Sequence, residues 1–162
     1  MMVTKIFRKN GRPCGIWKLH ILYGTKKQKL LKASEFIYAE VKGWGADLPG
    51  GKKEFDDYSF VVFPAAKAYE GFLKKLFLDM GFITQEDYFG KHFRIGKALN
   101  PSLEKDLRRE GVYDKIIKYC QGHELADNLW NTWKMSRNLI FHWFPNEKNQ
   151  FFFWKSRELI WI

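Results

Sequence analysis

Three polar residues that together could bind a phosphate ligand and exchange a proton with it lie near the end of one predicted helix. Arg137, Asn138 and His142 fall within residues 124–144, where apolar side chains recur at helical spacing until Pro145. Asn138 and His142 are four residues apart, so we expect them to share a helix face. Arg137 and His142 are roughly 140° apart around a regular helix, so their side chains can converge only on a groove that both flank.

An arginine and a histidine beside one groove have the groups that cleavage of an RNA phosphodiester requires. A base must take the proton of the 2′-hydroxyl and an acid must protonate the leaving 5′-oxygen, and an imidazole suits both tasks near pH 7. A guanidinium supplies fixed positive charge to the phosphate oxygens. The four histidines are scattered without the spacing of metal ligands, so no metal and no cofactor is expected.

The composition favours a negatively charged partner. The chain has 162 residues, with 28 Lys and Arg against 18 Asp and Glu, for a net charge of +10. Such a surplus points to nucleic acid or to an anionic membrane, although a protein can also be basic without either. No apolar run approaches the ~18 residues of a membrane span. The first residues lack a signal-peptide pattern, so we expect a cytoplasmic protein without a membrane partner.

The elements that must position these residues are mainly helical. Residues 58–80 show a wide apolar stripe at helical spacing, with Pro64 suited to a first turn and Gly81 as the stop. The apolar tail, residues 150–162, is expected to pack back on the helices. Trp130 and Trp133 are expected in the core or in a dimer interface. Shorter helices are expected over residues 89–99, 103–109 and 112–120.

The first 55 residues are expected to form a separate extension. Thr4–Phe7 and Gly15–Tyr23 favour strands on either side of an Asn10-Gly11 turn, which predicts a β-hairpin. Residues 29–41 fit a helix or a strand, and residues 42–51 have the composition of a loop. The basic run formed by Lys26, Lys27, Lys29 and Lys32 fits either a phosphate contact or a solvated turn. The fold class is therefore mainly α, with a helical bundle over residues 56–162.

Two segments resemble a known family. Residues 136–142, SRNLIFH, resemble the R-x(4–6)-H signature of HEPN-domain ribonucleases, in the form Arg-Asn-x-x-x-His. Residues 63–76, FPAAKAYEGFLKKL, resemble the early helix of HEPN toxins of the RnlA (ribonuclease LS) type. The resemblance covers roughly residues 57–145, and it implies a bundle of four or five helices.

The resemblance also implies an activity, which is metal-independent cleavage of RNA by a toxin or an antiphage effector. Such domains form homodimers whose two motifs share one composite cleft, and a protein antitoxin is a further expected partner. Arg137 would stabilise the scissile phosphate, and His142 would act as general acid or base. Glu70 would be the third catalytic residue. The expected substrate-binding residues are Asn138, Lys74 and Lys67, the last standing where the family has an arginine.

Simpler interpretations of the same residues stay open at this stage. Arg137 fits an exposed helix position, and His142 fits a C-terminal residue that interacts with the helix dipole. Glu70 and Lys74 have the spacing of an ordinary ion pair within one helix. The alternative function is therefore a HEPN module that binds RNA or regulates a partner without catalysis.

Overall fold

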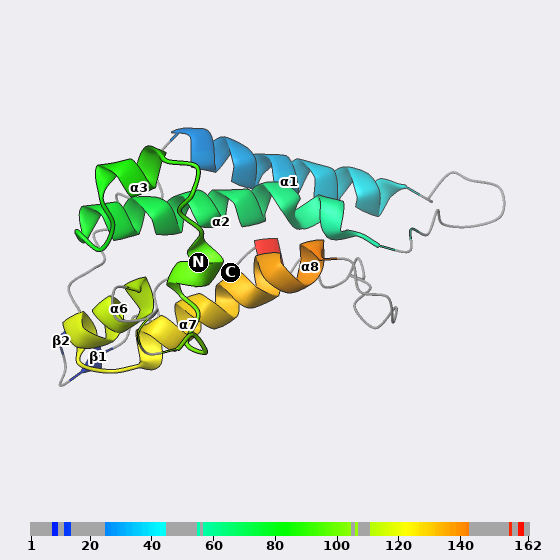
Figure 1. The fold of residues 1–162 in the computed structure, drawn as a ribbon. Helices are drawn as coiled ribbons and strands as arrows, with labels where there is room; N and C mark the ends of the chain where they lie inside the picture. The colour runs from blue at the N-terminus through cyan, green and yellow to red at the C-terminus, as the bar shows by residue number, and fades with distance from the viewer. Residues whose placement is uncertain are drawn as a thin grey trace.

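The fold is mainly helical, as the composition and periodicity predict (Figure 1). The structure is a computed structural model, and it describes residues 8–9, 12–13, 25–44, 55, 57–104, 106, 111–142, 156 and 159–160. The α-helices are α1 (Thr25–Gly43), α2 (Ser59–Asp79), α3 (Gln85–Phe89), α4 (Ile95–Ala98), α6 (Val112–Cys120), α7 (Glu124–Trp133) and α8 (Leu139–Phe141), and a π-helical segment, η2 (Lys134–Asn138), joins the last two.

A short antiparallel pairing lies near the N-terminus. Strand β1 (Arg8–Lys9) pairs with β2 (Arg12–Pro13), with Arg8 opposite Pro13 and Lys9 opposite Arg12. The paired residues stand on either side of the predicted Asn10-Gly11 turn. The strands expected over residues 4–7 and 15–23 lie outside the described residues.

The helix α1 packs along α2, which resolves the open choice between helix and strand for residues 29–41 (Figure 1). Ser34 of α1 is fully buried, and its Oγ accepts a hydrogen bond from the backbone N–H of Ala65 at 2.9 Å. A proline has no N–H and its ring crowds the preceding turn, so helical bonding is disturbed near Pro64. The Ser34 hydroxyl thus satisfies the buried backbone N–H of Ala65, the residue after this proline.

The sequence analysis places Pro64 in the first turn of α2, and this expectation is wrong. The helix starts at Ser59, whose backbone N–H donates to Asp57 Oδ1 at 2.6 Å, and Pro64 lies inside it. Because Asp57 satisfies a first-turn donor, the start of α2 is fixed before the proline is reached. The predicted end is confirmed, since Gly81 adopts a φ of 67° and Phe82 N–H donates to Phe77 O at 2.8 Å.

The expectation of one helix over residues 89–99 is also wrong. Thr84 and Asp87 form a capping box that starts α3 earlier, at Gln85. Gly90 then has extended backbone, and helix resumes over α4 alone. Residues 112–120 form α6 as predicted. Most of the helix expected over residues 103–109 lies outside the described residues.

Two clusters of buried apolar residues hold the helices together, and α2 contributes to both. The larger cluster joins the second half of α2 to α4, α6 and α7, and Trp130 and Trp133 pack against it. The smaller cluster consists of Val41, Val61, Val62, Ile140 and Ile160. Ile160 confirms that this part of the apolar tail packs on the helices. The domain boundary predicted at residue 55 falls between α1 and α2, which share this second cluster.

We predict that Ser34→Ala lowers the free energy of unfolding by about 1–3 kcal/mol, because the Ala65 N–H would stay buried without this acceptor. Urea or thermal unfolding followed by circular dichroism measures the change. Ser102→Ala is the matched control, since Ser102 is exposed, and it should change the stability by less than about 0.5 kcal/mol. Equal stability of the two variants would contradict the proposed role of the Ser34 hydroxyl.

Candidate active site

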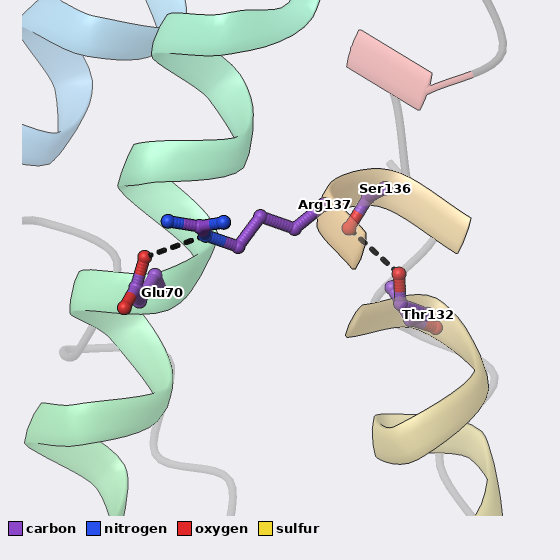
Figure 2. Close-up of polar contacts among 4 residues, drawn as sticks. All are labelled: Glu70, Thr132, Ser136 and Arg137. Carbon is purple, nitrogen blue, oxygen red and sulfur yellow. Dashed lines mark hydrogen bonds and ion pairs between the residues drawn. The ribbon is translucent and has the colours of Figure 1, made fainter. Parts of the chain in front are cut away.

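The last long helix contains a wide turn that the sequence analysis did not predict. The expected regular helix over residues 124–144 is wrong, because α7 passes into η2 at Lys134 before α8 begins. Leu139 N–H donates to Lys134 O, five residues back, and Ser136 Oγ donates to Thr132 O at 2.6 Å (Figure 2). A hydroxyl that bonds the carbonyl one turn back distorts a helix locally. Isolated π turns are frequent at functional sites.

Glu70 and Arg137 meet across two helices. Arg137 Nε donates to Glu70 Oε2 at 3.1 Å, which joins η2 to the middle of α2 (Figure 2). The two side chains are 40% and 33% exposed, so solvent reaches the pair. Among the described residues, no partner is recorded for the four N–H groups on the two Nη atoms of Arg137. The guanidinium is therefore anchored at one edge, and its terminal donors remain available to an anion.

One face of α2 lines this contact. Phe63, Lys67, Glu70 and Lys74 follow at intervals of four, three and four residues, which places them in one row along the helix. We call this row the α2 strip. Lys67 Nζ lies 6.0 Å from the centroid of the Phe63 ring, and the Phe63 side chain is exposed. The two lysines thus place positive charge on either side of Glu70.

An aromatic contact ties the end of α8 to the same strip. The rings of Phe63 and Phe141 meet edge to face, with their centroids 5.3 Å apart. Phe141 precedes His142 directly, so His142 lies toward the Phe63 end of the strip, while Arg137 contacts its middle. The sequence analysis missed both phenylalanines. Their positions in the sequence could have indicated them, since Phe63 is the first residue of one segment that resembles the HEPN family and Phe141 lies within the other.

His142 lies beyond the helix instead of on its surface. It caps α8 at the C-terminus with extended backbone, at φ −97° and ψ 129°, and its side chain is exposed. The expectation that Asn138 and His142 share a regular helix face is therefore wrong, because η2 ends at Asn138 and His142 has left the helix.

The arrangement supplies acid–base and electrostatic groups. It combines an anchored guanidinium, two flanking ammonium groups and an exposed imidazole beside an aromatic pair. Among the described residues, no group of three or more His, Cys, Asp or Glu side chains could hold a metal ion. In the same part of the chain, no helix has the length and apolar character needed to cross a bilayer. Groups of these types can bind an anion and exchange protons with it.

We predict a small coupling energy between Glu70 and Arg137, below about 1 kcal/mol, because both side chains are partly exposed. A double-mutant cycle with Glu70→Gln and Arg137→Gln, followed by urea unfolding, measures it. The Lys75–Asp79 pair, which is also partly exposed, gives a matched reference cycle. A coupling above 2 kcal/mol would show that the contact serves mainly to stabilise the fold.

No protein-family model matches the chain, and no curated protein and no solved structure matches it either.

Proposed function

We propose that the protein is a metal-independent endoribonuclease of the HEPN type. The observation that carries this proposal is the contact of Arg137 with Glu70, which fixes a guanidinium beside the α2 strip with its terminal donors available. Lys67 on the strip and His142 at the end of α8 add a second cation and an imidazole that can act as an acid or a base. The resemblance of the two segments to HEPN ribonucleases implies catalytic roles for Arg137, His142 and Glu70 and a substrate-binding role for Lys67.

The proposed reaction is an internal transfer of the phosphodiester. The 2′-oxygen attacks phosphorus as a base takes its proton, and the bond from phosphorus to the 5′-oxygen breaks as an acid protonates that oxygen. The products are a 2′,3′-cyclic phosphate and a 5′-hydroxyl. Arg137 offsets the charge that develops on the phosphate oxygens, Glu70 fixes the direction of the guanidinium, and Asn138, Lys67 and Lys74 contact the RNA.

Unpaired RNA suits this reaction best. In-line attack needs a backbone that can rearrange around the scissile bond, and loops and single strands allow it more easily than a duplex does. A protein with this activity would harm the cell that makes it, so we propose a toxin or antiphage effector in the cytoplasm. A protein antitoxin with an acidic surface would complement the net charge of +10.

We predict that the wild type cleaves single-stranded RNA in the presence of EDTA and that His142→Ala lowers the rate by about 10²-fold or more, since it removes an acid–base group. Arg137→Ala should cause a similar loss. The controls are His123→Ala and Arg94→Ala, because both side chains are exposed and neither residue is assigned to the site. Denaturing gels and mass spectrometry of the ends follow the products.

Several outcomes would count against this assignment. Equal cleavage by His142→Ala and His123→Ala would exclude His142 from catalysis, and loss of cleavage in EDTA would indicate a metal nuclease. The position of His142 at the end of α8 favours one alternative, an RNA-binding module in which the imidazole interacts with the helix dipole. In that case wild type and His142→Ala would both bind RNA, neither would cleave it, and the variant would be less stable.

The resemblance to HEPN ribonucleases implies a composite site, in which one histidine could take a proton while its counterpart from a second copy donates another. We predict a dimer in solution, in which His142 from each copy contributes to one cleft. Sedimentation equilibrium over a range of concentrations tests it, and the cleavage rate per chain should fall as dimers dissociate. A monomer that retains full activity would require both proton transfers to occur within one chain.

A further inference from the structure

The first half of α1 carries lysines that the proposed reaction leaves unused. Lys26, Lys29 and Lys32 are exposed and stand three residues apart, which places them in one row on the helix surface. Neighbours at this spacing repel one another when their charges are alike. Glu35, the next residue of this row, is the first one with a negative charge.

The position of these lysines within α1 is also unfavourable. The first turn of α1 contains no acidic residue, although the N-terminus of a helix favours negative charge. Lysines there gain nothing from the helix dipole. The sequence thus concentrates positive charge where the stability of the isolated chain would disfavour it, and a bound polyanion would relieve the repulsion.

Contacts between α1 and α2 extend the positive charge across both helices. Lys27 lies over Gly71, where a Cβ would stand 3.8 Å from Lys27 Cε. Burial and the nearby Lys75 lower the pKa of Lys27, and Asp79 acts in the opposite direction. Asp79 also forms an ion pair with Lys75. The Asp79 carboxylate therefore interacts with two lysines, Lys27 and Lys75.

This charged region adjoins the candidate site. Gly71, over which Lys27 lies, follows Glu70 in α2, and Lys75 follows Lys74 of the α2 strip. The Lys27 stem thus lies against α2 at Gly71, the residue after Glu70 of the Glu70–Arg137 contact. Lys27 and Lys75 therefore lie next to the α2 strip, on the side that faces the start of α1.

We propose that Lys26, Lys27, Lys29, Lys32 and Lys75, together the lysine end, bind phosphates of single-stranded RNA that continues beyond the candidate active site. This inference rests on the proposed function for its choice of RNA. A membrane surface fits less well, because α1 packs its Ser34 and Val41 face against α2 and exposes a single large apolar side chain, Phe36, among its described residues. The lysine end would hold substrate without taking part in bond cleavage.

The test measures binding separately from cleavage. A labelled 20-nucleotide RNA with 2′-O-methyl groups throughout cannot undergo attack by a 2′-hydroxyl, so its Kd can be measured by anisotropy at several salt concentrations. Lys26→Ala/Lys29→Ala should lower the magnitude of the salt slope by about 1.4, since each phosphate contact on a single strand contributes about 0.7. Lys42→Ala/Lys118→Ala is the matched control, because both lysines are exposed and lie away from the lysine end.

The outcomes separate this inference from the proposed reaction. A smaller slope for the first variant alone supports the lysine end, even if the wild type cleaves no RNA and the proposed function fails. Equal slopes for the two double variants would overturn it, even if cleavage is confirmed. Binding of phosphatidylserine vesicles, but not of RNA, by the wild type would overturn it as well. Thermal melting should show Lys26→Ala/Lys29→Ala folded and no less stable than the wild type, because it removes repulsion.

Discussion

The burial of α2 between its neighbours is the constraint on which the rest of this fold depends. This helix contributes to both apolar clusters, packs along α1, and receives the last helix on another face. Phe63 and Lys67 of the α2 strip remain exposed, and Glu70 is partly exposed. The site is thus built on a helix that several neighbouring helices hold in place, and such support keeps reactive groups in a fixed geometry.

The contact between Arg137 and Glu70 uses this rigidity for position more than for stability. A partly exposed ion pair contributes little to folding because water screens both charges. Its effect is to orient the guanidinium, since bonding at Nε fixes one edge of a planar group and thereby the direction of the others. The Phe63–Phe141 contact holds the backbone before His142 in place. It does so through burial of ring surface and not through charge.

Local patterns in the sequence predicted much of the helical content and little of the detail at the site. The stripe of α2 and the stop at Gly81 follow from periodicity and from the need for a positive φ. Residues 29–41 left helix and strand open because their apolar positions fit both periods, and packing on α2 decides between them. Pro64 suggested the wrong start for α2, because the Asp57 side chain accepts a hydrogen bond from the Ser59 N–H and the helix begins there. The pairing of Glu70 with Arg137 spans 67 residues, and local periodicity carries no information about it.

The wide turn at η2 has a consequence for how the reactive groups are aimed. A turn closed by a bond from Leu139 N–H to Lys134 O holds one residue more than a regular turn does. Everything after it is rotated by roughly 100° relative to an unbroken α-helix of the same sequence. The relative orientation of guanidinium and imidazole is therefore set by where the extra residue is accommodated, and a shift of that bulge along the chain would re-aim one group while leaving the other in place.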